Sequence, residues 1–221
     1  MIRSTLVKRI VVLTALIAAV SVIAGGCSSS GLNGAVVRTT DTVIKTTVPH
    51  TTEAPVSDKI NITAVPSKTS VKAGDTFDIT IKITSDKPNR GAQFVVTWDP
   101  AKVSCVSVSD GGYYKDFAIA HDGDILMLPT NPTADNTIGQ FPKLSASVKQ
   151  FAVAMTGAQG TGGTFLGPTG TGDVMVLHMT AKAGASGSVE FKISDAHLVD
   201  ATADSNTLYP KINNATISVT P

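Results

Sequence analysis

The residue types that perform acid–base or metal chemistry are sparse in this chain of 221 residues. It contains only two glutamates, Glu53 and Glu190, whereas a glycosidase needs two carboxylates at a set separation. Aspartates are more numerous, but most stand in turn-like sequences such as Asp99-Pro100, where hydrogen bonds to the local backbone explain them. The four histidines show no His-Glu-x-x-His spacing. We therefore expect neither glycosidase nor metalloprotease chemistry.

Other catalytic and metal-binding motifs are missing or incomplete. The stretch His121-Asp122-Gly123-Asp124 hints at a metal loop, but it lacks the alternating ligands of an EF-hand. The glycine-rich stretch 157–172 does not end in Gly-Lys-Ser or Gly-Lys-Thr, as a phosphate-binding loop would. No Gly-x-Ser-x-Gly elbow is present, although spacing alone does not exclude a Ser–His–Asp triad. We expect a protein with no catalytic role, no bound metal and no cofactor of its own.

The composition favours an extracellular all-β protein. The formal net charge is +1, which argues against a nucleic-acid partner and against a basic membrane-binding patch. Thr, Ser, Val, Gly and Ala are abundant, whereas charged residues make up 16% of the chain. β-Branched residues suit strands better than helices, so the elements that must position any functional residue are expected to be strands.

The first 26 residues are predicted to be a lipoprotein signal peptide. Arg3, Lys8 and Arg9 precede an apolar run from Ile10 to Ala24 that is too short to span a bilayer comfortably. The run ends in Ile-Ala-Gly-Gly before Cys27, which resembles a bacterial lipobox. The resemblance implies cleavage before Cys27 and lipid attachment to that residue, and more than one acyl chain gives stable anchoring. The alternative is an ordinary signal peptide with a chance cysteine.

The remaining cysteine, Cys105, has no partner if Cys27 carries lipid. We predict that Cys105 is a small buried core residue, because it lies in a β-rich run. Residues 27–58 are rich in threonine, serine and proline and show no sustained apolar period. Such a segment does not fold by itself, and we interpret it as a tether that gives the folded domain reach.

Residues 59–221 are predicted to form a single β-rich domain. In the stretch 91–100, Ala92, Phe94, Val96 and Trp98 alternate with polar positions and Pro100 ends the strand. Trp98 has the parity of the inward row and is expected in the core. Further strands are expected at 60–65, 76–83, 103–109, 117–120, 125–128, 148–155, 174–182, 188–193 and 215–219. Many short strands with frequent turns indicate a sandwich or barrel.

Four stretches carry a resemblance to a known family, and they occur in the family's order. They are 71–77 with its Gly74-Asp75 turn, 91–108 with its aromatic-Asp-Pro strand, 173–187 with its Gly-Ser turn, and 189–200 with its Leu-x-Asp ending. Together they resemble a cohesin module over roughly residues 60–219. This resemblance implies an all-β fold, a nine-stranded antiparallel jelly-roll β-sandwich.

The resemblance also implies a function, because cohesins bind dockerins, which are small calcium-loaded helical modules of other secreted proteins. Calcium is accordingly expected on the partner rather than on this chain. The dockerin is expected to lie against one sheet face that includes both the 91–98 strand and the 174–182 strand. The outward residues of these two strands are the predicted contacts: Gln93, Val95, Thr97, Val176, His178 and Thr180.

Two alternatives stay open beside dockerin binding. The outward rows are equally typical of a solvated β face with tolerated valines. A carbohydrate-binding or adhesive module of the same fold is the other, with polysaccharide as its ligand, and Tyr113, Tyr114 and Tyr209 would be its aromatic contacts if they are exposed. In either case we expect an extracytoplasmic protein that is anchored to a membrane through its lipid and displayed at the cell surface.

Overall fold

The computed structural model describes residues 57–202 and 206–221, with side-chain surroundings from Lys59 onward. The predicted signal peptide, Cys27 and almost all of the predicted tether lie outside the described residues. The first strand begins at Ser57, close to the predicted start of the domain. Within the described part of the chain, no helix is long and apolar enough to cross a bilayer.

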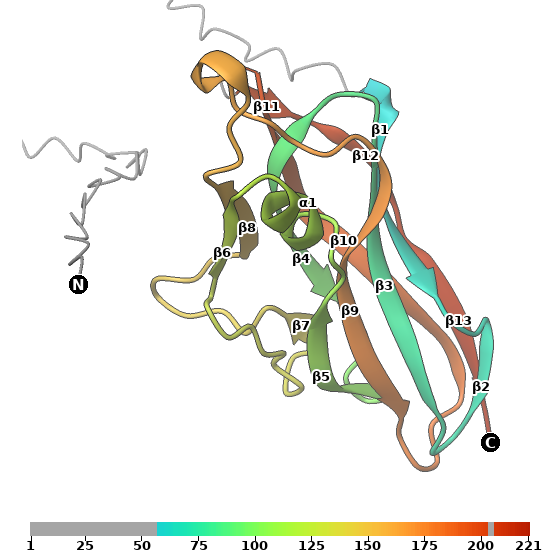
Figure 1. Cartoon of the computed structure of the whole chain (residues 1–221). Coiled ribbons are helices and arrows are strands. Elements are labelled where there is room, and N and C mark those ends of the chain that lie inside the picture. The colour runs from blue at the N-terminus through green and yellow to red at the C-terminus, as the bar shows by residue number, and fades with distance from the viewer. Residues whose placement is uncertain (1–56, 203–205) are drawn as a thin grey trace, which may run out of the picture. The chain divides into compact units, whose positions relative to one another are not determined.

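One sheet of the domain has five strands in the order β12-β1-β3-β9-β5. Their bounds are Pro210–Asn213 (β12), Ser57–Pro66 (β1), Thr76–Ser85 (β3), Gly170–Ala181 (β9) and Val103–Asp110 (β5). β3 and β9 pair antiparallel over almost their whole lengths. Figure 1 shows them running lengthwise through the domain. β5 is an edge strand of this sheet.

The other sheet has the order β2-β13-β10-β4-β8-β6, with β11 paired to β10 and β7 paired to β4. The bounds are Ser70–Lys72 (β2), Ala215–Thr220 (β13), Gly187–Asp200 (β10), Asn89–Thr97 (β4), Phe151–Thr156 (β8), Asp124–Leu128 (β6), Thr207–Leu208 (β11) and Gln140–Phe141 (β7). Of the thirteen strands in the described residues, nine have five residues or more. The predicted all-β sandwich is confirmed, although β1–β12 and β2–β13 pair parallel.

The core lies between the two sheets and consists of the inward rows of their strands. On β3, Phe77, Ile79, Ile81 and Ile83 are all buried, while the residues between them are half-buried. This is the expected consequence of the pleat, which sends alternate side chains to opposite faces of a sheet. The ring of Phe191 on β10 lies 6.1 Å from that of Phe77, so aromatic contacts join the two sheets.

Trp98, which directly follows β4, lies in this core as its parity predicts. Its side chain is 5% exposed and its ring centroid is 6.4 Å from that of Phe191. The indole Nε1 is the one buried side-chain nitrogen or oxygen among the described residues that has no hydrogen-bond partner. An unpaired buried donor costs about 1–3 kcal/mol, so the packing of this ring must outweigh that loss.

The stretch predicted as a strand at 117–120 is instead a short helix, α1, at Lys115–Ala120. The strand prediction for Phe117 to Ala120 is therefore wrong. Tyr114 and Ala118 are four residues apart, and the helix buries both on the same side. The Tyr114 hydroxyl donates to the side-chain oxygen of buried Asn89 at 2.5 Å. A 3-10 turn, η1, lies at Thr161–Gly163 in the second long loop.

Phe191→Ala should destabilise the domain by about 3–5 kcal/mol, because it removes a fully buried ring that contacts Phe77 and Trp98 and leaves a cavity. The measurement is urea unfolding of the full chain followed by tryptophan fluorescence. Val106→Ala is the matched control, since Val106 is 70% exposed and should change stability by less than about 0.5 kcal/mol. Equal effects of the two substitutions would contradict the assigned core.

Cys105 is a free, buried cysteine, as predicted. Burial raises the pKa of its thiol to about 11, so the reactive thiolate is scarce at pH 8. We expect iodoacetamide to alkylate Cys105 in the native protein at pH 8 more than tenfold more slowly than in urea, with the adduct located by mass spectrometry. Equal native and unfolded rates would show that the thiol is accessible and ionised in the folded protein.

Candidate functional site

The structure places the two predicted contact rows on opposite sheets. Gln93, Val95 and Thr97 lie on β4, whereas Val176, His178 and Thr180 lie on β9. β4 belongs to the sheet of β10 and β8, and β9 belongs to the sheet of β3 and β5. The expectation that all six residues share one face is therefore wrong. Parity within a strand tells which side chains point away from the core, but it does not tell to which sheet the strand belongs.

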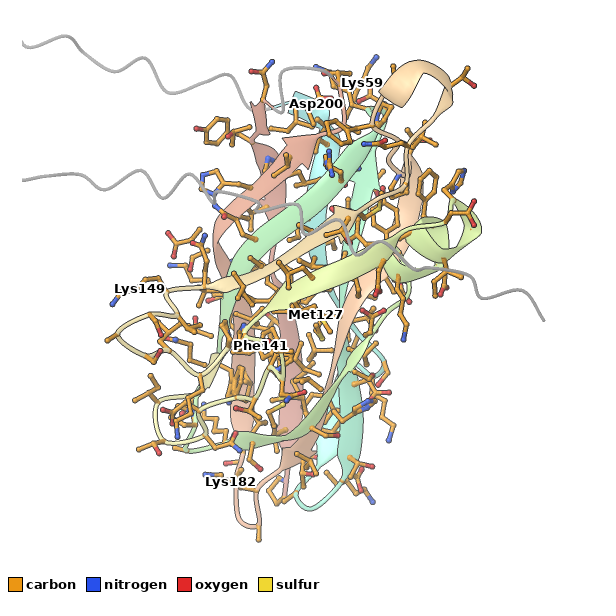
Figure 2. The ribbon with its side chains drawn as sticks, turned by 60° about the vertical axis from the view of Figure 1, so that its left-hand side comes forward. Lys59, Met127, Phe141, Lys149, Lys182 and Asp200 are labelled. Atoms are coloured by element: carbon orange, nitrogen blue, oxygen red, sulfur yellow. The ribbon has the colours of Figure 1, made fainter. Side chains whose placement is uncertain are left out.

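The row on β4 forms part of a continuous outer face over β10, β4, β8 and β6. Residues that pair across antiparallel strands point to the same side, so the register defines rows that cross all four strands. One row is Val199, Gly91, Ala154 and Leu126, and the next is His197, Gln93, Ala152 and Leu128. Figure 2 brings β6, with its labelled Met127, to the front of the domain.

The β6 end of this face is apolar and exposed. Leu126 is 48% exposed and Leu128 is 55% exposed, and they lie opposite Ala154 and Ala152 of β8. We call these four residues the apolar strip. Because the alanine side chains are short, the two leucines of the strip project beyond the neighbouring surface of β8. Adjacent exposed leucines with a polar surround are typical of a protein-binding patch.

A β-bulge in β10 completes the face. The register with β4 shifts between Ser194 and His197. Phe191 and Ile193 point into the core before the bulge, and unbroken alternation would send Val199 inward as well. The extra residue reverses the parity, so His197 and Val199 face outward instead. The sequence carries no signal for this reversal, and the predicted contacts accordingly include neither residue.

The β4–β10 end of the face is polar. The side-chain amide of Gln93 lies 2.9 Å from Nδ1 of His197, and the rings of His197 and Tyr209 pack in a T-shape with their centroids 5.1 Å apart. Thr97 is half-buried and pairs with exposed Lys192 across the strands. Val95, between Gln93 and Thr97, is only 5% exposed. Its predicted role as an exposed apolar contact is therefore wrong.

The row on β9 lies on the outer face of the five-stranded sheet, which is polar. His178 hydrogen-bonds Asp78 of β3 and Ser109 of β5 at 2.8 and 3.0 Å. Lys82 forms an ion pair with Asp173 on the same face. Val176 and Thr180 are half-buried beside these groups. The described residues on the central strands β3 and β9 of this face include no exposed large apolar side chain, and the exposed Val106 lies on the edge strand β5.

The aromatic residues do not form a sugar-stacking platform. Tyr114 is 2% exposed and Tyr113 is half-buried against it, with ring centroids 5.0 Å apart. Tyr209 is half-buried beside His197. Phe165 is 39% exposed, but the guanidinium of Arg90 covers its ring face at 3.8 Å. In the described part of the chain, no group of three His, Cys, Asp or Glu residues is placed to hold a metal ion.

Comparison with known proteins decides the family. The sequence model of the cohesin domain matches residues 62–219. This chain belongs to the cohesin domain family. The match covers nearly all of the described domain, and it confirms the resemblance that the ordered turns and strands carry. None of the curated proteins matches the sequence significantly.

Solved cohesin structures share the fold of this domain. A type II cohesin domain from the cellulosome of Acetivibrio cellulolyticus is 18% identical, with a TM-score of 0.50 over 74% of this chain and 95% of that one. The third cohesin ScaC from the same organism, solved in complex with the ScaB dockerin, is 13% identical, with a TM-score of 0.50 over 73% and 98% of the two chains. At such identities the likeness shows the fold alone.

Proposed function

We propose that this cohesin domain binds a dockerin-bearing protein through the outer face of β10, β4, β8 and β6. The observation that carries the proposal is the apolar strip, in which Leu126 and Leu128 are about half exposed on the outer face of the sheet. Support for the class of partner comes from the family and from a solved complex of a cohesin with a dockerin.

The physical contrast between the two outer faces supports this choice of face. The centre of a protein interface is depleted of charged residues and enriched in apolar ones. The apolar strip has that character, whereas the opposite face carries Asp78, Lys82 and Asp173. A partner helix that lies on the strip would cover the two leucines, which are already about half buried, so the burial of their remaining surface would contribute about 1 kcal/mol each.

The polar end of the same face supplies the orientation of the partner. Gln93 and His197 hold each other in place, and His197 uses only Nδ1 for hydrogen bonds within the described part of the chain. Its Nε2 is therefore available to a hydroxyl or amide of the partner. Lys192, which is exposed opposite Thr97, would favour an acidic group there. Gln93 and Thr97 remain proposed contacts, and Leu126 and Leu128 join them.

The proposed setting of the domain is the outer side of a membrane. A lipid on Cys27 would fix the position of the protein, and the Thr-, Ser- and Pro-rich segment 27–58 would set its reach. Calcium would belong to the dockerin rather than to this chain. The protein would then act by recruitment, and docking itself requires no covalent chemistry.

The docking test uses the immobilised full chain and the secreted proteins of its source organism, with and without EDTA. We expect calcium-dependent capture of a protein that carries a dockerin module, and direct binding of that module after purification. Capture that survives EDTA, or retention of the chain by polysaccharide alone, would contradict the proposal.

Variants locate the contact face. Leu128→Asp and Thr97→Asp should each weaken dockerin binding at least tenfold, or about 1.4 kcal/mol, because each buries a new charge in the interface. Val106→Asp and Thr180→Asp are the matched controls: Val106 is 70% exposed and Thr180 is half-buried, and both lie on the other sheet. Stronger losses in the two controls would move the contact to the opposite face.

Lipid anchoring predicts a separate result. Cys27→Ala removes the proposed attachment site, so the protein should move from the detergent phase to the aqueous phase in Triton X-114 partitioning of cell extracts. Cys105→Ala is the control, because a buried core cysteine carries no lipid, and it should stay in the detergent phase. A wild-type protein that partitions into water would contradict the anchor.

A further inference from the structure

The strands at the ends of the two sheets differ in how well they are guarded against pairing with another strand. An edge strand leaves a row of backbone N–H and C=O groups unpaired, and proteins guard such rows with bulges, proline, lysine or very short strands. β5 carries a bulge, and the side-chain amide of Asn136 binds both backbone groups of Cys105 at 2.7 and 2.8 Å. β12 begins at Pro210, and β2 is only three residues long. Of the four strands that end the two sheets in the described residues, three are therefore guarded.

β6 is the remaining edge strand, and it has none of these guards. Its sequence, Asp-Ile-Leu-Met-Leu, contains no lysine and no proline, and its register with β8 runs without a shift. In Figure 1 it lies at the margin of the domain with β8 beside it. Leu126 and Leu128 are about half exposed. A regular, apolar and exposed edge strand is a template on which another strand pairs.

The hydrogen bonds around β6 show which of its backbone groups face the open side. The carbonyl of Met155, opposite Ile125, accepts from the guanidinium of Arg90 on β4 and so points away from β6. The N–H of Ile125 donates to the Asp124 carboxylate at 2.8 Å instead of to β8. Because backbone direction alternates along a strand, the C=O of Ile125 and both backbone groups of Met127 also face the open side. No backbone group in the described part of the chain pairs with them there.

The same edge on a second copy of the chain presents the complementary row of groups. In antiparallel pairing about a two-fold axis through Leu126, Ile125 of each copy lies opposite Met127 of the other. Each such pair exchanges both of its N–H···O=C bonds, so every open backbone group of the two strands is satisfied once Asp124 releases the N–H of Ile125. A helix does not offer its backbone groups in this way, because it pairs them internally.

The charges and side chains of β6 suit this register. Asp124 is the one charged residue of the strand, and it lies opposite Leu128 of the second copy, so two carboxylates do not oppose each other. Leu126 lies opposite its counterpart as a non-hydrogen-bonded pair, in which side chains approach most closely.

The neighbouring registers satisfy fewer backbone groups. One of them places Pro129, which has no N–H, opposite Ile125. The other places Gly123 opposite Met127, and the N–H of Gly123 already donates to the Ala118 carbonyl at 2.7 Å. The symmetric register centred on Leu126 is therefore the one that the edge favours.

We propose that two copies of this chain associate through their β6 edges, so that the two eight-stranded sheets join into one continuous sheet. The apolar strips of both copies would then lie side by side, with Leu126 against Leu126 at the axis. The join uses the backbone edge of β6, whereas docking uses its outer face, so this association does not rest on the proposed function. Because β6 has five residues, the join is short, and we expect a reversible dimer whose population rises with protein concentration.

The test is sedimentation equilibrium of the chain from residue 27 onward, with Cys27→Ala so that neither lipid nor an extra thiol interferes, and with no partner protein present. We expect a monomer–dimer equilibrium. Leu126→Lys places two lysines directly opposite each other and should weaken association at least tenfold. Leu128→Lys is the matched control, because it places a lysine opposite Asp124 of the second copy and should leave the dimer at least as stable as the wild type. Equal losses in both variants, or a wild-type chain that stays monomeric throughout a concentration series, would overturn the proposal.

Cysteine trapping checks the register. Leu126→Cys brings two thiols together at the axis, and mild oxidation should link the copies through a disulfide that mass spectrometry maps to position 126. Ile212→Cys is the control, because Ile212 is 41% exposed on β12, a guarded edge of the other sheet, and it should give at least tenfold less linked dimer. Equal yields from the two variants would indicate random collision and contradict the β6 join.

Met127→Pro separates association from docking. It removes an N–H that faces the open side, where an edge strand tolerates proline, so the variant should fold, as thermal unfolding checks, but stay monomeric. Its dockerin binding should equal that of the wild type, because Leu126 and Leu128 keep their outward faces. Thr97→Asp should do the reverse, weakening docking without changing association. A folded Met127→Pro variant that dimerises like the wild type would rule out pairing through this edge.

Discussion

Burial of one side of every long strand between the two sheets is the constraint on which the rest of this structure depends. The inward rows, such as Phe77 to Ile83 on β3 and Phe94 to Trp98 on β4, fill the core almost without exposure. Once those rows are fixed, the pleat leaves each intervening residue facing outward. Both outer surfaces of the domain therefore consist of the residues that do not point into the core.

The two outer faces differ because different strands contribute them. Leu126 and Leu128 give one face an exposed apolar end, while Asp78, His178 and Lys82 keep the other face polar and internally paired. On the first face, a partner that covers the exposed leucines would lower the free energy by removing apolar surface from water. The second has its charged groups already satisfied, so a partner there would have to replace existing interactions. This division explains why one outer face suits docking better than the other.

A β-bulge changes which residues point outward on each of the two outer faces. A single extra residue in β10 turns His197 outward beside Gln93, and another in β5 turns Ser109 outward beside His178. Each bulge reverses the alternation that the preceding buried residues establish. Because a bulge changes the face of every residue after it, two such positions decide which polar groups meet across the strands.

The sequence by itself was sufficient for the family, the all-β sandwich, the inward row that ends in Trp98 and the buried Cys105, because these follow from local alternation and from ordered turns. It did not reveal that β4 and β9 lie in opposite sheets, nor that Val95 is covered. Strand partners can be 100 to 150 residues apart in the chain, as Asp78 and His178 or Thr63 and Asn213 are. Pairing over such distances is decided by the packing of the whole core and by bulges, and neither leaves a local pattern in the sequence.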